Sequence, residues 1–186
     1  GSVVISGAGY HAGGLLTTGP FRPSAGRART GKMAENTDTF RGAVALPDLE
    51  ATTRLGGGIA AGLKLGDAVA LWGDLGAGKT TLARAILRAL GVTGEVPSPT
   101  FTLVQGYDTA RLPVSHYDLY RLKQAREIEE LGFDDALADG AVLVEWPERA
   151  PEALPPDALH VRLSLVDGAR QARLTGPARW ESLMHV

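Results

Sequence analysis

The sequence predicts an α/β domain with three layers, in which helices cover a mixed central sheet. Two observations favour this class. Strand-like and helix-like segments alternate along the chain, and residues 68–72 and 141–146 are continuous apolar runs, typical of strands buried on both faces. The length of 186 residues suits one small domain. We expect this domain to span residues 41–178.

The first element of the domain is expected to be a helix that begins after Asp48, a suitable N-cap residue. Glycines at positions 56–58 predict that the helix is bent, broken or closely packed there. A strand over 68–72 and a helix over 80–91, closed by Gly91, should follow. The apolar residues of the first helix recur at near-helical spacing: Leu49, Leu55, Ile59 and Leu63.

The second half of the domain is predicted to be richer in strands. Residues 100–108 and 112–120 are expected to form two strands joined by a turn, followed by a helix over 125–133 and a buried strand over 141–146. Alternation along the second of these strands places Val114, His116 and Asp118 on one face. The dipeptide Asp167-Gly168 predicts a closing hairpin between residues 158–167 and 169–176.

The two ends of the chain differ from this central part. Residues 1–32 carry no acidic residue and no hydrophobic period, so we expect residues 1–40 to form a disordered leader. This leader is either sequence added in cloning, a native N-terminal extension preceding a natural start at Met33, or an arginine-bearing transit peptide. Residues 179–186 are expected to form a C-terminal tail.

The composition excludes several classes of function. The chain has no cysteine, which excludes disulfides, thiolate metal sites and cysteine nucleophiles and fits a reducing compartment, so a cytoplasmic location is expected. The net charge of -2 argues against a protein that coats duplex nucleic acid, although it leaves a weak or shared RNA contact open. No apolar run approaches the roughly 20 residues of a membrane span, so we expect no membrane partner.

Residues 73–80 have the spacing of a phosphate-binding loop, G-x-x-x-x-G-K-T, between a buried strand and a helix. Its glycines let backbone amides surround phosphate oxygens, and the helix that follows adds its positive end. Lys79 should reach the β- and γ-phosphates of a nucleotide, and Thr80 should ligate Mg²⁺. The predicted nucleotide-binding residues of the loop are Gly73, Asp74, Leu75, Gly76, Ala77, Gly78, Lys79, Thr80 and Thr81.

Hydrolysis requires an acidic group near the phosphates. Glu145 ends a buried strand, where α/β sheets present ligands, and is expected to contact the metal or the attacking water; a helix cap is the alternative. Asp118 is either a carboxylate beside the metal, a turn cap or a surface partner of Arg121. Thr100, in a rigid Ser-Pro-Thr segment, is a candidate Mg²⁺ ligand. His116 is interpreted as a structural histidine.

Five segments together resemble one family closely, in order and in spacing: GDLGAGKTT, VPSPTFTLVQGY, SHYDLYRL, ELGFDD and VLVEWPERA. This is the bacterial ATPase family of tRNA threonylcarbamoyladenosine biosynthesis, called TsaE, and the resemblance extends from about Leu46 to Leu174. It implies a P-loop NTPase-like domain that binds ATP and Mg²⁺ and releases ADP, with low activity alone.

The resemblance also implies a biological context and a set of residue roles. The family acts on a transferase complex of TsaB- and TsaD-type subunits, which forms N6-threonylcarbamoyladenosine at position 37 of tRNAs that read codons beginning with A. Contact with tRNA itself is expected to be indirect or weak. The implied catalytic residues are Lys79, Glu145 and Asp118; the implied Mg²⁺ ligands are Thr80, Glu145 and Thr100; Thr52 and Trp146 are implied to lie against the nucleotide.

Three alternatives stay open on the residues alone. A P-loop small-molecule kinase shares the loop and the size, although the segment after the central helix is two-stranded rather than an arginine-bearing lid. A GTP-driven switch normally needs an Asn/Thr-Lys-x-Asp tetrad, which this chain lacks. A module that binds nucleotide without hydrolysing it is the third. No residue identifies itself as an arginine finger, which would suit faster hydrolysis in a complex.

Overall fold

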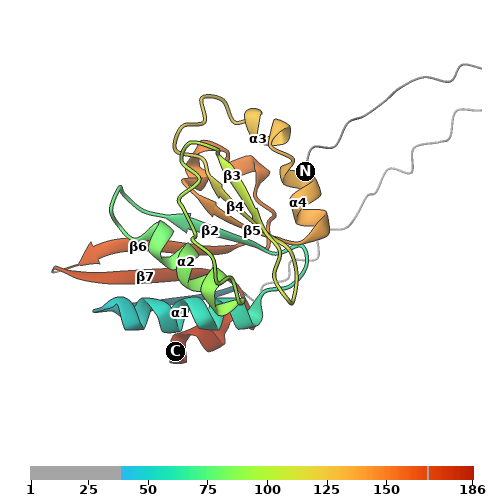
Figure 1. Cartoon of the computed structure of the whole chain (residues 1–186). Coiled ribbons are helices and arrows are strands. Elements are labelled where there is room, and N and C mark those ends of the chain that lie inside the picture. The colour runs from blue at the N-terminus through green and yellow to red at the C-terminus, as the bar shows by residue number, and fades with distance from the viewer. Residues whose placement is uncertain (1–38, 167) are drawn as a thin grey trace, which may run out of the picture. The chain divides into compact units, whose positions relative to one another are not determined.

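A seven-stranded mixed sheet forms the centre of the protein (Figure 1). The structure is a computed structural model that describes residues 39–166 and 168–186. The sheet has the strand order β1-β7-β6-β2-β5-β4-β3, which confirms the predicted α/β class with a mixed sheet. The strands, in chain order, are β1 (Thr39–Leu46), β2 (Ala68–Trp72), β3 (Val104–Tyr107), β4 (Val114–Asp118), β5 (Ala141–Glu145), β6 (Leu159–Val166) and β7 (Ala169–Pro177).

The sheet has a parallel centre and antiparallel edges. Strands β6, β2, β5 and β4 run parallel to one another, whereas β3 pairs antiparallel with β4, and β7 pairs antiparallel with both β6 and β1. The carboxyl ends of β2, β5 and β4 therefore meet at one edge of the sheet, which is the edge where α/β folds bind ligands.

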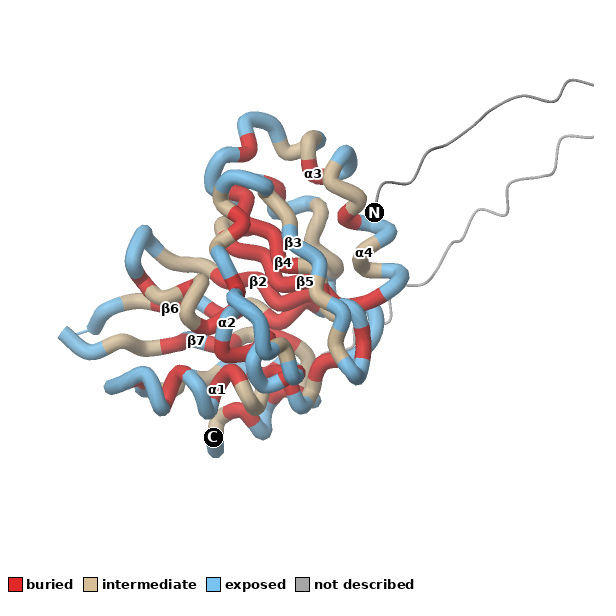
Figure 2. The backbone as a smooth tube through the Cα atoms, in the orientation of Figure 1, coloured by how far each residue is buried: buried red, intermediate tan, exposed pale blue. Residues whose placement is uncertain are grey.

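Helices cover both faces of the sheet, in three layers. One face packs against α1, α2 and η3, and the other face packs against α3, α4 and the segments that follow β5. The tube in Figure 2 is mostly red through the central strands, because they are buried on both faces. The helices, in chain order, are α1 (Leu49–Gly62), α2 (Lys79–Ala89), α3 (Glu127–Glu130), α4 (Phe133–Asp139) and the 3-10 helices η1 (Pro147–Arg149), η2 (Pro151–Ala153) and η3 (Ala178–His185).

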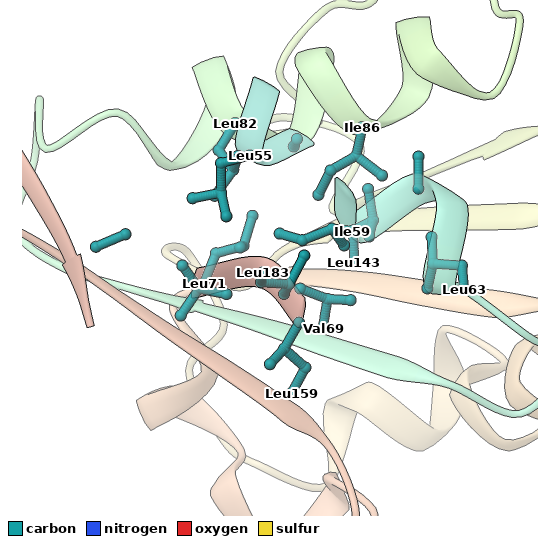
Figure 3. Packing of buried hydrophobic residues seen from close by; sticks show 14 of the residues in the cluster. Leu55, Ile59, Leu63, Val69, Leu71, Leu82, Ile86, Leu143, Leu159 and Leu183 are labelled. Atoms are coloured by element: carbon teal, nitrogen blue, oxygen red, sulfur yellow. The ribbon is translucent and has the colours of Figure 1, made fainter. Parts of the chain in front are cut away.

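The larger hydrophobic cluster lies between the sheet and the pair α1–α2. Leu55 and Ile59 of α1 meet Leu82 and Ile86 of α2 above the apolar side chains of the central strands (Figure 3). Each of these four side chains is fully buried, and complete burial of a leucine or isoleucine side chain contributes roughly 1.5–3 kcal/mol to folding. The phosphate loop thus begins and ends on tightly packed elements, β2 and α2.

Helix α1 begins as the sequence predicted. The backbone N–H of Ala51 donates a 2.7 Å hydrogen bond to the side chain of Asp48, which confirms the N-cap. The helix continues through its three glycines, and two of them are closely packed: a Cβ at Gly56 would lie 2.5 Å from the Cβ of Ala85 on α2, and a Cβ at Gly58 would lie 2.9 Å from Leu183. Leu49 is an exception to the predicted apolar face, since it is 66% exposed.

Three features differ from the sequence prediction. Strand β1 starts at Thr39, inside the segment expected to be disordered, while the rest of that predicted leader lies outside the described residues. The single helix expected over 125–133 is two short helices, because Gly132 adopts a left-handed conformation with φ of 69° between them. The expected tail forms η3, whose Trp180 is buried against Gly62 of α1.

Among the residues placed by the structure, no helix combines the length and the hydrophobicity needed to cross a bilayer.

Candidate nucleotide site

The loop between β2 and α2 has the backbone that its glycines permit. Gly73, Gly76 and Gly78 have φ values of 135°, 81° and 108°, which side-chain-bearing residues rarely adopt. At Gly73 the restriction is also steric, because a Cβ there would lie 2.4 Å from the carbonyl oxygen of Leu163 on β6. The loop therefore leaves β2 at a fixed point and turns at once into α2.

Lys79, the first residue of α2, is held inside this loop. Its Nζ donates hydrogen bonds to the carbonyl oxygens of Gly73 (2.6 Å) and Asp74 (2.9 Å) and lies 3.8 Å from the centroid of the Trp146 ring. Burial lowers the pKa of Lys79 below the ordinary value of 10.5, because it disfavours the charged form. Four carboxylates partly offset this effect: Glu145, Glu148, Asp118 and Asp74.

Glu145 joins the loop to the neighbouring strand. The hydroxyl of Thr80 donates a 2.9 Å hydrogen bond to Oε2 of Glu145, and Nε2 of His116 lies 2.9 Å from Oε1. An ionised carboxylate only accepts hydrogen bonds, so the imidazole N–H is the donor. Both Glu145 and His116 are buried. His116, interpreted from the sequence as structural, therefore holds a predicted site residue in place.

Asp118 has one of the roles that the sequence left open, the turn cap, and its role beside a metal stays a prediction. Its Oδ2 accepts hydrogen bonds from the hydroxyls of Thr100 (2.6 Å) and Ser98 (3.2 Å), while its Oδ1 caps the turn by accepting from the backbone N–H of Tyr120 (3.1 Å). The third alternative is wrong, since the described residues show no ion pair between Asp118 and Arg121. Asp118 thus lines the site and caps the turn that follows the strand.

The strand that carries His116 and Asp118 has the predicted alternation. His116 and Asp118 project toward the site, while the next residues along the strand, Tyr117 and Leu119, belong to the hydrophobic cluster on the opposite face of the sheet. Because the strand has a period of two, Asp118 lines the cavity and His116, on the same face, is buried against Glu145.

Trp146 follows Glu145 in a backbone conformation that is rare for a large side chain. Its φ and ψ are 58° and 49°, in the left-handed region. The indole ring lies beneath the Lys79 ammonium and 4.8 Å, centroid to centroid, from the ring of Tyr120. Such strained positions cost on the order of 1–3 kcal/mol and cluster at functional sites. Here the left-handed turn places the ring against the phosphate loop.

These side chains line one cavity of about 320 Å³ at the carboxyl edge of the sheet. Ten of its lining residues were predicted from the sequence to belong to the site, and two, Ser98 and Tyr120, were not. Ser98 stands two residues before Thr100 in the Ser-Pro-Thr segment, which was the available signal. The lining residues are Leu75, Gly76, Gly78, Lys79, Thr80, Thr81, Ser98, Thr100, Asp118, Tyr120, Glu145 and Trp146.

Four predicted nucleotide-binding residues do not line this cavity. Gly73, Asp74 and Ala77 belong to the loop itself, and the backbone carbonyls of Gly73 and Asp74 hold the Lys79 ammonium. Thr52 is buried in α1, where its hydroxyl donates a 3.2 Å hydrogen bond to the carbonyl oxygen of Asp48. Its position beside an adenine stays a prediction.

The oxygen atoms of the cavity suit a hard cation. Two carboxylates, from Glu145 and Asp118, and the hydroxyls of Thr80, Ser98 and Thr100 line the same space. Mg²⁺ is usually held by one or two carboxylates, several waters and substrate phosphates. Across the described residues there is no cluster of three or more His, Cys, Asp or Glu that could hold a metal by itself. The donors therefore fit a Mg²⁺ ion that binds together with phosphates.

Comparisons with known proteins identify the family of this chain. The family model for "Threonylcarbamoyl adenosine biosynthesis protein TsaE" matches residues 46–173. The tRNA threonylcarbamoyladenosine biosynthesis protein TsaE of Rickettsia felis is 44% identical over 119 residues, which are 63% of this chain and 70% of the relative. Its counterpart in Synechocystis sp. is 48% identical over 114 residues, 58% of this chain and 71% of that protein.

A solved structure is similar over most of both chains. The crystal structure of Bacillus subtilis YdiB has a TM-score of 0.63 and 32% sequence identity, and the match covers 79% of this chain and 92% of that one. The family match covers more than half of the sequence and includes the loop, the buried carboxylates and Trp146. The chain belongs to the TsaE family.

Proposed function

We propose that this protein binds and hydrolyses ATP with Mg²⁺ and is required for forming N6-threonylcarbamoyladenosine at position 37 of tRNAs that read codons beginning with A. The observation that carries the proposal is the shared cavity of Lys79, Thr80, Glu145 and Asp118. The names of the relatives supply the pathway, since they are tRNA threonylcarbamoyladenosine biosynthesis proteins. Its action is on a transferase complex of TsaB- and TsaD-type subunits.

The loop supplies the binding energy for the phosphates. Phosphoryl transfer depends on positioning and on neutralising charge more than on covalent chemistry. The backbone amides after Gly76 and the N-terminal end of α2 favour an anion, and the Lys79 ammonium, held at the inner wall of the loop, faces the same space. These groups would bind the β- and γ-phosphates of ATP.

Thr80, Glu145 and Thr100 are the proposed ligands of Mg²⁺, with Asp118 holding Thr100 through a 2.6 Å hydrogen bond. The ion would neutralise phosphate charge when bound. Glu145 would accept a hydrogen bond from the attacking water and orient it. His116 orients the Glu145 carboxylate, because its N–H donates a hydrogen bond to Oε1. The other oxygen, Oε2, then faces Thr80 and the cavity.

Stimulation by the partner complex is part of this proposal, and the lining of the cavity supports it. An arginine supplied by a partner raises phosphoryl-transfer rates by about 10³–10⁵ in other P-loop proteins. Among the residues lining the cavity, Lys79 is the cationic side chain, and no arginine lines it. We therefore expect slow hydrolysis by the chain alone and faster hydrolysis when the transferase subunits bind over the cavity.

The test is phosphate release from Mg-ATP by the full chain, alone and with the TsaB- and TsaD-type subunits. The variant is Glu145→Gln, which keeps the shape and removes the charge. The matched control is Glu148→Gln, because Glu148 is an exposed carboxylate three residues away that also acts on Lys79. We expect partner-stimulated hydrolysis that falls about 10²–10⁴-fold in Glu145→Gln and stays near wild type in Glu148→Gln.

Two results would count against the proposal. Equal rates in the two variants would remove Glu145 from the mechanism. Transfer of the phosphate to a metabolite, without release of free phosphate, would identify a small-molecule kinase instead.

A further inference from the structure

The antiparallel half of the sheet has one face that the α1–α2 layer does not cover. Along β1, β7 and β6, alternate residues such as Phe40, Leu174 and Val161 belong to the cluster beneath α1 and α2. The residues between them point to the opposite side, and the arginines among them are exposed. On this opposite side lies a hollow of about 370 Å³. Its lining residues are Trp72, His160, Arg162, Arg173 and Thr175.

We name these five residues, with Arg41 beside them, the basic face. Their arrangement follows from strand register. Arg162 of β6 stands directly opposite Arg173 of β7, and Trp72 of β2 is the next residue in the same row. Arg41 of β1, Thr175 and His160 form the adjacent row. Two rows of basic and aromatic side chains therefore lie side by side across four strands.

The positive charge of the basic face has no internal compensation. Like charges placed directly opposite on paired strands are destabilising. The described residues contain no ion pair from Arg41, Arg162 or Arg173 to any carboxylate. Arg173 donates only to the amide oxygen of Gln171, at 3.4 Å, and Arg162 lies 5.0 Å from the centroid of the Trp72 ring. Such a surface is complementary to an anion.

His160 is arranged to donate a hydrogen bond at this surface. The indole N–H of Trp72 donates to its Nδ1 at 3.1 Å, so the neutral imidazole carries its proton on Nε2. Partial burial, and then the nearby Arg162, lower the pKa of His160 and favour this neutral form. Trp72 itself is partly exposed and is held by both neighbours.

We propose that the basic face binds the phosphates of RNA. Arginines around a partly exposed aromatic ring, with neutral hydrogen-bond donors between them, are the combination that proteins use to hold an RNA strand through its backbone and bases. The overall net charge of -2 does not oppose this, because the basic groups are concentrated on one face. This surface is distinct from the nucleotide site, because the two hollows share no lining residue.

The experiment measures binding of a fluorescently labelled, unmodified tRNA transcript to the full chain by anisotropy, without nucleotide, over a range of salt concentrations. The variant is Arg162→Gln with Arg173→Gln. The control is Arg54→Gln with Lys64→Gln, which removes the same charge from exposed positions in and after α1. We expect the slope of log affinity against log salt to lose about 1.4–1.8 in magnitude in the variant, since each phosphate contact contributes roughly 0.7–0.9.

The control pair should keep the wild-type slope. The proposal is overturned if wild-type chain does not bind the transcript, or if both pairs lose affinity equally, which would indicate a general charge effect. Arginine-dependent binding of inorganic phosphate as tight as that of tRNA would instead assign a small-anion site. Arginine-dependent binding of polyglutamate, but not of tRNA, would assign an acidic protein partner. Because nucleotide is absent, failure here leaves the ATPase proposal standing.

Discussion

Replacement of Lys79 by methionine should separate nucleotide binding from folding. The substitution keeps an unbranched side chain of similar length and removes the ammonium that faces the cavity. A hydrogen bond to a charged partner contributes about 1.5–3 kcal/mol, and each 1.4 kcal/mol is about tenfold in affinity. Lys79→Met should therefore weaken ATP binding by roughly tenfold to a hundredfold.

Stability of the empty protein should change much less. The variant loses the hydrogen bonds from Nζ to Gly73 and Asp74, at 2.6 and 2.9 Å. It also removes a cation whose burial is unfavourable, as the lowered pKa of Lys79 indicates. These two effects have opposite signs and partly cancel. We expect the free energy of unfolding of the empty protein to change by about 1 kcal/mol, the typical net contribution of a hydrogen bond.

The assay combines a titration with a fluorescent ATP analogue and urea unfolding with and without Mg-ATP. At a ligand concentration of 100 times the wild-type Kd, bound nucleotide stabilises the wild type by about 2.7 kcal/mol. A tenfold weaker Kd reduces this to about 1.4 kcal/mol, and a hundredfold weaker Kd to about 0.4 kcal/mol. Lys64→Met, at an exposed lysine after α1, is the control. Equal nucleotide stabilisation in both variants would refute the role given to Lys79.

Further outcomes follow from the same structure. ATP affinity should fall as pH rises through the lowered pKa of Lys79, starting below the ordinary lysine value of 10.5, and a titration should show no such fall in Lys79→Arg, because arginine stays protonated. Gly56→Ala should destabilise by about 1–3 kcal/mol through overpacking against Ala85, whereas Gly57→Ala, with open space around it, should stabilise by up to about 1 kcal/mol; equal urea midpoints would contradict this. Trp180→Ala should destabilise by about 3–5 kcal/mol in the same measurement, and a loss below 1 kcal/mol would mean that η3 is dispensable.

The fold was predictable where the pattern is local. The apolar runs that form β2 and β5 and the turn dipeptide between β6 and β7 identify their strands without any knowledge of neighbours. Strand β1 was missed because its sequence, TFRGAVAL, has a weak alternation and includes Gly42. It becomes a strand through its pairing with β7, which lies more than a hundred residues away. Its burial depends on contacts that a local pattern does not contain.

The site was predictable in its residues more than in its contacts. Spacing and strand ends pointed to Lys79, Thr80, Glu145 and Asp118, and all four line one cavity. The hydrogen bond between His116 and Glu145 joins residues on two adjacent parallel strands, so it depends on the register of β4 against β5. No spacing rule within one segment specifies that register. The backbone of Trp146 likewise reflects tertiary contacts, since propensity disfavours a left-handed tryptophan.

The chain of hydrogen bonds from Thr80 through Glu145 to His116 has a consequence for the entropy of nucleotide binding. A free glutamate side chain samples many rotamers, and confining it costs on the order of 1.5–2 kcal/mol of conformational entropy. Here both carboxylate oxygens are already committed before any ligand arrives, so that loss belongs to folding rather than to nucleotide binding. The entropy cost of binding therefore falls on the nucleotide and its water, because the Glu145 side chain is already ordered in the empty site.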